Sequence, residues 1–218
     1  MNKDIYVIIE QLDGIIKRVS LELIGEARRL SKKLGEKVVA VLLGNDIEDK
    51  AELLIKYGAD EVLVIDNPML EPYMTSPYTK AVSSIIEKRK PSIVLFPATS
   101  IGRDLAPRVA ARIGTGLSAD VTEFDIDKDD KSLLMIMPAF GGNIMATIVS
   151  KVKRPEMATV RAGVMLPLEK DMNRSGKIER FEIEFDDSDR DVLIREVVIE
   201  AEEKDDISNA EIIVAGGI

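Results

Sequence analysis

Residues 5–9 read IYVII, an unbroken apolar run near the start of the 218-residue chain. Comparable runs stand at residues 38–43 (VVAVLL), 61–65 (EVLVI) and 92–96 (SIVLF). A half-exposed strand alternates apolar and polar residues, whereas a strand buried on both faces shows no such alternation. The four runs therefore predict the centre of a parallel sheet that is covered on both sides.

The segments between these runs have the spacing of helices. In the first of them, apolar residues recur at intervals of four, three and four, at Leu23, Ala27, Leu30 and Leu34. This spacing predicts a helix with Ser20 as its N-cap and Gly35 as its stop. Further helices are expected at residues 48–57, 79–88 and 104–113. Alternating strands and helices indicate an α/β fold, a doubly wound parallel sheet.

The pattern changes after Gly116. Four strands follow with connections too short for helices, and they are expected at residues 120–127, 133–137, 143–149 and 157–164. Glycines 141 and 142 give a turn signal between two of them. An antiparallel meander that extends the sheet is the predicted arrangement.

The net charge of −9 comes entirely from the last quarter of the chain. Residues 166–218 carry 16 Asp and Glu against 7 Lys and Arg, whereas residues 1–165 hold 23 of each kind. No dominant basic surface is expected, which argues against a nucleic-acid partner. The change in composition predicts an α/β domain at residues 1–165, an acidic linker with extended strands at 166–206, and a further unit that starts at 207–218.

The final segment fits two interpretations. Residues 212–217 read IIVAGG, which resembles a buried strand followed by a glycine turn. In α/β folds such a turn opens a phosphate-binding helix, so the segment is expected to be the start of a truncated second domain. The alternative is a strand that adds to the edge of the first sheet.

The chain contains no His, no Cys and no Trp. This excludes a Ser-His-Asp triad, a thiolate nucleophile, a disulfide and the usual Cys/His zinc sites. We therefore predict no catalytic side chain and no metal site, and any chemistry must depend on other side chains or on a cofactor. No apolar run approaches the roughly 18 residues of a membrane span, and no signal peptide is evident, so a cytoplasmic location is expected.

Two places carry charge where ligands bind in α/β sheets. Arg103 and Asp104 follow the strand at 92–96, and they fit either an anion site or a helix cap with a surface ion pair. Arg161 lies within an apolar run and needs a partner, a ligand or solvent, because an unpaired buried charge is costly. The glycines at 141 and 142 fit either the close approach of a flat ligand or a tight hairpin.

Several stretches, taken together and in order, resemble the alpha subunit of electron transfer flavoproteins over essentially the whole chain. They read VSLEL at 19–23, ATSIGRDLAPRVAAR at 98–112, TGLSADVT at 115–122, PAFGGNIMAT at 138–147 and RPEMATVR at 154–161. The resemblance implies a sheet of the adenine-nucleotide-hydrolase-like type that binds no nucleotide itself. It also implies a heterodimer with a beta subunit, and a C-terminal FAD domain whose first turn would begin at Gly216 and Gly217.

The resemblance is strongest to the bifurcating branch of that family. There the beta subunit holds an FAD together with NAD, and electrons pass from NADH through this FAD to a dehydrogenase or to ferredoxin. The implied dehydrogenase acts on an acyl-CoA or a 2-hydroxy acid. By this likeness Arg161 would lie near the reactive flavin nitrogen, and Gly141, Gly142 and Asn143 would face the flavin. Met137 stands where such relatives have Arg, which leaves simple electron transfer open.

Two other functions compete with this interpretation. A stand-alone nucleotide-binding module of the stress-protein type would use the strand edge near Thr99 and Arg103, although the chain has no phosphate loop. A purely structural subunit would dock a partner through the acidic residues 166–218. Under the favoured interpretation the chain is an electron-transfer subunit of an oxidoreductase complex, not a free-standing enzyme.

Overall fold

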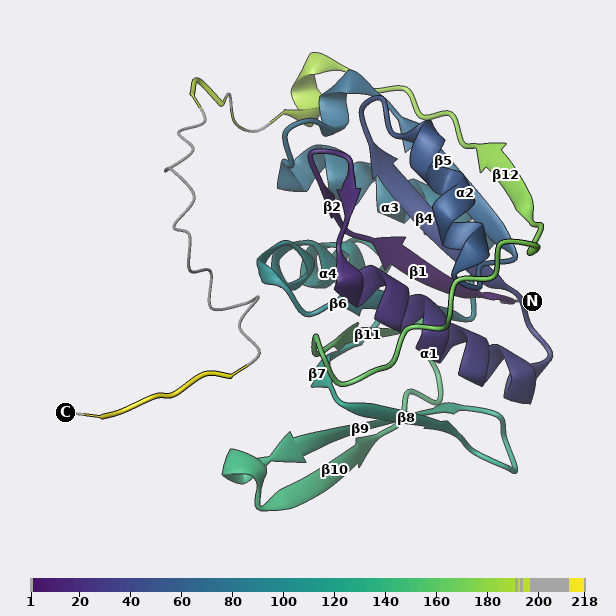
Figure 1. Ribbon diagram of the computed structural model, residues 1–218, viewed down its shortest axis with the longest axis vertical. Coiled ribbons are helices and arrows are strands. Elements are labelled where there is room, and N and C mark those ends of the chain that lie inside the picture. The colour runs from purple at the N-terminus through teal and green to yellow at the C-terminus, as the bar shows by residue number, and fades with distance from the viewer. Residues whose placement is uncertain (1, 191, 193, 197–211, 218) are drawn as a thin grey trace.

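A computed structural model describes residues 2–190, 192, 194–196 and 212–217. Its main sheet has seven strands, all parallel, in the order β12-β5-β4-β1-β6-β11-β7 (Figure 1). In chain order these are β1 (Ile5–Ile9), β4 (Val38–Gly44), β5 (Glu61–Asp66), β6 (Ile93–Pro97), β7 (Leu117–Val121), β11 (Glu156–Val160) and β12 (Lys177–Arg180). The predicted parallel sheet is confirmed.

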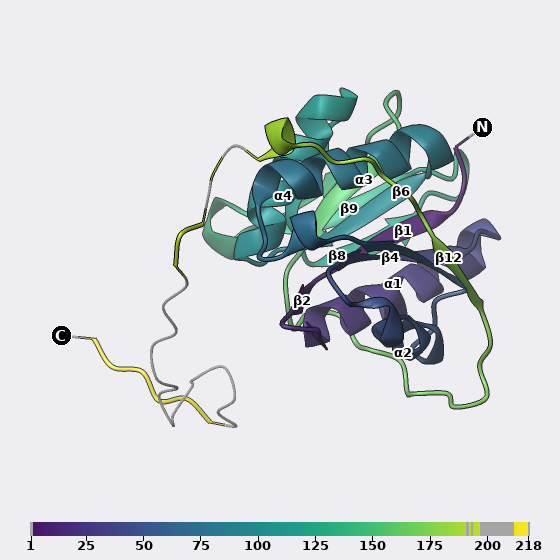
Figure 2. The ribbon, with the colours of Figure 1, turned by 90° about the horizontal axis from the view of Figure 1, so that it is seen from above.

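Four helices cover the sheet: α1 (Arg18–Leu34), α2 (Ala51–Lys56), α3 (Thr75–Arg89) and α4 (Ser100–Ile113). Figure 2 shows α1 and α2 on one face of the sheet and α3 and α4 on the other. Successive strand residues point to opposite faces. Thus Ile5 and Val7 join the core under α1 and α2, whereas Tyr6 and Ile8 join the core under α3 and α4. This double coverage explains the unbroken apolar runs.

The meander prediction is partly wrong. Three antiparallel strands do form, β8 (Glu123–Ile126), β9 (Leu133–Ala139) and β10 (Ile144–Ile148), but they make a separate sheet, which we call the arm. The strand expected at 120–127 is divided at Thr122, two residues after Asp120 with its positive φ of 61°. The strand expected at 157–164 is parallel β11, which pairs with β6 and β7 in the main sheet.

The polar segment after residue 165 packs on the domain. A Cβ added to Gly25 of α1 would lie 2.3 Å from the carbonyl oxygen of Leu166, and one added to Gly58 would lie 2.8 Å from Leu168 Cδ1. Arg174 donates to Asp60 at 2.8 Å, and β12 then pairs with β5. Residues 166–180 are therefore built into the fold, and α1 needs glycine where they cross it.

Two residues considered as helix caps, Ser20 and Asp104, do not cap their helices. The first helix begins at Arg18, so Ser20 lies inside it, and the Ser20 hydroxyl accepts from the Glu10 backbone N–H at 2.8 Å. The fourth helix begins at Ser100 and is capped by Thr99, whose hydroxyl accepts from Gly102 N at 3.1 Å. Asp104 is no cap, since its carboxylate accepts from Tyr73. Ser20 and Asp104 therefore make tertiary hydrogen bonds instead of capping the helices near which they lie.

Smaller elements complete the chain. They are the hairpin strands β2 (Gln11–Leu12) and β3 (Ile15–Ile16), and the 3-10 turns Glu48–Lys50, Pro68–Leu70, Phe140–Gly142 and Asp187–Asp189. Of the segment 166–206, which is expected to hold extended strands, residues 191, 193 and 197–206 lie outside the described residues. Residues 212–217 form no strand, and Ile212, Ile213 and Val214 are exposed. The strand predicted at 212–215 is therefore not seen.

One buried carboxyl joins the arm to the main sheet. Glu156, at the start of β11, is only 3% exposed, and its two oxygens accept from the Leu133 backbone N–H at 3.2 and 3.3 Å. Burial raises the pKa of Glu156 to about 7, and the nearby Arg154 only partly opposes this rise. The folded protein therefore holds a proton that the unfolded chain, with an ordinary Glu pKa of about 4.3, releases.

We expect this group to make the protein less stable as the pH rises. Its contribution is fully present below about pH 4 and is lost as the pH rises through about 7, because the folded state binds the extra proton in between. Replacement of Glu156 by Gln keeps an acceptor for Leu133 without the charge. It should raise the free energy of unfolding at pH 8 by up to about 3 kcal/mol and leave it nearly unchanged at pH 4.5.

Urea unfolding at both pH values measures this difference. The matched control is Glu87→Gln, on the exposed surface of α3. Equal effects of the two substitutions at pH 8 would contradict the assignment.

Candidate functional site

The carboxyl ends of the parallel strands meet at one edge of the sheet, where ligands bind in open α/β folds. Glu10 follows β1, Thr99 follows β6, and Arg161 follows β11. Asp120 stands near the end of β7, and its N–H donates to the Thr159 hydroxyl at 2.8 Å. The topology thus gathers charged residues that are up to 151 positions apart in the sequence.

Two arginines at this edge share one carboxylate. Arg161 donates to Asp120 Oδ2 from Nη2 at 2.5 Å and from Nε at 3.2 Å. Arg103, at the start of α4, donates to Asp120 Oδ1 at 3.1 Å and to the Ala98 carbonyl at 3.0 Å. We call Arg103 and Arg161 the arginine pair. The sequence did not decide what either arginine binds. In the structure both bind the carboxylate of Asp120.

The charges of this group do not cancel. The hydrogen bond from Arg161 lowers the pKa of Asp120, so this carboxylate is ionised at neutral pH. Two guanidinium groups then face one negative charge, and their side chains are 62% and 45% exposed for Arg103 and Arg161. The edge beside β7 and β11 therefore keeps an accessible positive charge that suits an anionic or electron-rich ligand.

The glycines of the arm form a tight hairpin. The turn Phe140–Gly142 joins β9 to β10, with positive φ at Gly141 (71°) and Gly142 (90°). Asn143 closes the turn by donating from Nδ2 to the Phe140 carbonyl at 3.3 Å. Within the described part of the chain, no hydrogen bond or ion pair joins this turn to Arg161. The structure thus accounts for the glycines through the turn, and the flavin-facing role of residues 141–143 stays a prediction.

Gly216 and Gly217 lie in the exposed segment 212–217. An added Cβ would meet nothing within 4 Å at either position. Their expected place at the start of an FAD domain also stays a prediction.

The N-terminus of α4 is already occupied by the protein's own groups. A nucleotide phosphate in such folds binds to free N–H groups at a helix N-terminus. Here the Thr99 side chain takes the N–H of Gly102, and the Thr99 hydroxyl donates to the carboxylate of Glu10. Gly102 packs so tightly that an added Cβ would lie 1.7 Å from the Pro97 carbonyl oxygen. A carboxylate thus stands close to where a phosphate would bind.

Sequence reasoning missed two features. One is Asp120 as the shared partner of the arginine pair, although the residue stands within the stretch at 115–122. The other is the apolar surface of the arm, where Phe140 is 83% exposed and Ile144 57%. The apolar letters of residues 144–148 are equally those of a buried strand, so no signal in the sequence marked this surface. Among the described residues, no helix is both long and apolar enough to cross a membrane.

A family model described as "Electron transfer flavoprotein domain" matches residues 5–186 of the chain. The chain belongs to the electron transfer flavoprotein family. It is 46% identical over 215 residues to the electron transfer flavoprotein subunit alpha of Thermoanaerobacterium thermosaccharolyticum, an alignment that covers 99% of this chain and 65% of the relative.

Two other relatives are named for particular reactions. The chain is 44% identical to the lactate dehydrogenase (NAD(+),ferredoxin) subunit LctC of Acetobacterium woodii, over 99% of this chain and 51% of the relative. It is 38% identical to the acryloyl-CoA reductase electron transfer subunit beta of Anaerotignum propionicum, over 99% of this chain and 65% of the relative. The chain thus spans less than two thirds of the length of these relatives.

The occupied N-terminus of α4 predicts that the chain binds no adenine nucleotide. Titration calorimetry with AMP and ATP should give only heats of dilution, because an added phosphate would meet the Glu10 carboxylate instead of free N–H groups. The positive control is a stress-type nucleotide-binding protein measured in the same buffer. A saturable isotherm with either nucleotide would contradict this prediction and would support the alternative function of a stand-alone nucleotide-binding module.

Proposed function

We propose that this chain is the scaffold portion of an electron transfer flavoprotein alpha subunit, which pairs with a beta subunit and covers its flavin. Electrons would pass from NADH through this FAD to a partner dehydrogenase or to ferredoxin. The observation that carries the proposal is the exposed apolar arm, in a chain of this family, beside a sheet edge that bears a free positive charge. The chain supplies no acid–base or thiol step of its own.

The arm has the character of a protein interface. Large apolar side chains are exposed along it and just beyond it: Phe140 (83%), Ile144 (57%), Met145 (54%), Ile148 (43%) and Val152 (88%). β10 is also an edge strand, with backbone groups open to another chain. A contiguous apolar patch on a protein surface marks an interaction site. We assign this surface of the arm to the beta subunit, with which alpha subunits of this family pair.

The arginine pair fits a place beside the flavin. The FAD supplies the redox chemistry when it is bound, and this chain's own residues hold a fixed positive charge beside it. A preorganised cation stabilises negative charge that develops on a bound group. Arg161 carries this role in the proposal, with Asp120 holding its guanidinium in place and Arg103 adding a second charge.

The finer assignment rests on the relatives and on single residues. LctC is named for NAD(+) and ferredoxin, which favours a bifurcating complex with NAD on the beta subunit. The acryloyl-CoA reductase subunit points to acyl-CoA chemistry. Met137, in place of the usual Arg, leaves simple transfer as the second candidate. We place the complex in the cytoplasm, and we assign Gly216 and Gly217 to the first turn of an FAD domain.

Charged substitutions on β10 should break the heterodimer. Ile144 and Ile148 lie on one face of the strand, and both are exposed when the chain has no partner bound. Burial of a large aliphatic side chain contributes about 1.5–3 kcal/mol, so the double substitution Ile144→Lys with Ile148→Lys should weaken association with the beta subunit by at least about 100-fold. The melting temperature of the isolated chain should not change.

Co-expression with the beta subunit, followed by sedimentation analysis, measures this loss. The matched control is Ile178→Lys in β12, a similarly exposed residue at the opposite edge of the main sheet. Equal assembly of the double variant and the control would refute the proposed interface.

Replacement of Arg161 by Ala should make the flavin of the assembled complex harder to reduce. Loss of a nearby cation should lower the two-electron potential by on the order of 30 mV, the equivalent of a tenfold change in the equilibrium constant. Spectroelectrochemistry of the heterodimer measures the shift, with Arg108→Ala on the exposed side of α4 as control. An unchanged flavin potential in the Arg161→Ala heterodimer would refute the role assigned to Arg161.

A further inference from the structure

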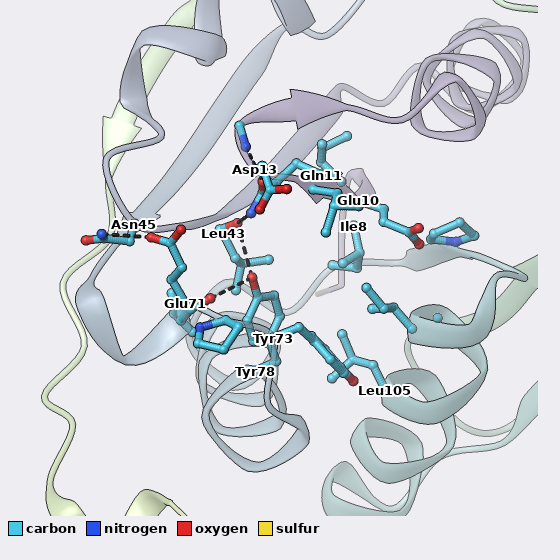
Figure 3. A pocket seen from close by; sticks show the side chains of 18 of the residues that line it. Ile8, Glu10, Gln11, Asp13, Leu43, Asn45, Glu71, Tyr73, Tyr78 and Leu105 are labelled. Carbon is cyan, nitrogen blue, oxygen red and sulfur yellow. Dashed lines mark hydrogen bonds between the residues drawn. The ribbon is translucent and has the colours of Figure 1, made fainter. Parts of the chain in front are cut away.

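A cavity lies at the same edge of the sheet but on the other side of β6 from the arginine pair. It has a volume of about 330 Å³ and stands over the ends of β1, β4 and β6 (Figure 3). The β2–β3 hairpin borders it on one side, and α3 and α4 border it on another. Its size is in the range of small-molecule sites, roughly 300–1,000 Å³.

The floor of the cavity is apolar and partly aromatic. It is formed by the side chains of Ile8, Leu43, Phe96 and Leu105, all of them buried. Tyr73 and Tyr78 form one wall, with their rings edge to face at 4.8 Å between centroids. Such a floor favours a flat apolar body.

The rim of the cavity is negatively charged. The described residues that line it include three carboxylates, Glu10, Asp13 and Glu71, and no Lys or Arg. Figure 3 shows Glu10, Asp13 and Glu71 around the opening; the first two lie on the segment that follows β1, and the third lies before α3. A cation is thus attracted to the opening, and an anion is repelled from it.

Four polar side chains of the lining each donate a hydrogen bond to the protein itself. Tyr78 donates to the Leu70 carbonyl at 3.1 Å, and Tyr73 donates to Asp104 at 2.8 Å. Asn45 donates to Glu71 Oε2 at 2.9 Å, and the amide of Gln11 points to the Leu43 carbonyl at 3.4 Å. The second oxygens of Glu10 and Glu71, and the carboxylate of Asp13, remain as acceptors. A complementary ligand therefore brings donors, which a protonated amine does.

We propose that this cavity binds a small apolar molecule with a protonated amine, its flat body on Phe96 and Tyr78 and its ammonium group at the rim carboxylates. Nothing in the electron-transfer role requires this site, and its occupant would not meet the arginine pair. The charge at the rim excludes nucleotides and other phosphate esters. The site is therefore distinct in chemistry from the positively charged part of the same edge.

Three indole probes of nearly equal size test the charge preference. Tryptamine carries an ammonium, tryptophol a hydroxyl and indole-3-propionate a carboxylate. Calorimetric titration of the chain at pH 7 should give the tightest binding for tryptamine, at least about fivefold weaker binding for tryptophol, and no binding for indole-3-propionate. Equal binding of all three, or no binding of tryptamine, would overturn the proposal.

Two sets of variants locate the site. Asp13→Asn with Glu71→Gln removes two rim charges, and Asn tolerates the positive φ of 51° at position 13. This double substitution should weaken the binding of tryptamine about 10-fold and leave the affinity for tryptophol unchanged. The control Glu87→Gln lies on α3 away from the cavity and should leave both affinities unchanged.

Ile101→Trp supplies an independent measurement. Ile101 lines the cavity from a partly exposed position in α4, so the larger ring narrows the opening without replacing a buried core residue. It should abolish tryptamine and tryptophol binding while circular dichroism and the melting temperature stay close to those of the unmodified chain. Full retention of tryptamine affinity in a folded Ile101→Trp variant would place the bound amine elsewhere and refute the site.

Discussion

Every functional feature of this molecule depends on the parallel pairing of β1 between β4 and β6. Parallel pairing requires each strand to return through a crossover, and the crossovers here put helices on both faces of the sheet. All seven strands then end at one edge. Glu10, Thr99 and Arg161 meet there only because their strands run in the same direction. Alternate side chains of β1 fill two separate cores, so neither helical layer can be lost without exposing half of the strand.

The edge that results is electrostatically divided. At β7 and β11, the arginine pair outnumbers the single carboxylate of Asp120 and keeps a positive charge. Across β6, the cavity over β1 and β4 has carboxylates at its rim, and no Lys or Arg is among the described residues of its lining. The Thr99 cap and the Glu10 carboxylate stand between the two halves, at the N-terminus of α4. Open α/β folds commonly bind ligands at this edge, and here the edge presents two different surfaces.

The arm extends this arrangement outward. It is attached through Glu156, which accepts from the Leu133 backbone, and through Phe124, which lies in the core under α1. Its far strand, β10, buries little within this chain. Much of its apolar surface thus remains available to another protein. In the proposed heterodimer, the arm supplies the contact area with the beta subunit, and the sheet edge supplies the positive charge that shifts the flavin potential. The two roles therefore belong to different parts of the molecule.

The sequence by itself determined the covered parallel sheet, most of the helices and the family, because these depend on local periodicity and on motifs read in order. It also marked Arg161 and the glycine turn of the arm. The tertiary structure alone decided that Asp120 holds both arginines, that Ser20 and Asp104 serve contacts other than caps, and that the arm leaves the main sheet. It also brought Asp13, Glu71 and Tyr78 around one cavity. Local periodicity reports which side of an element is apolar, whereas partners distant in the chain are set by how the elements pack.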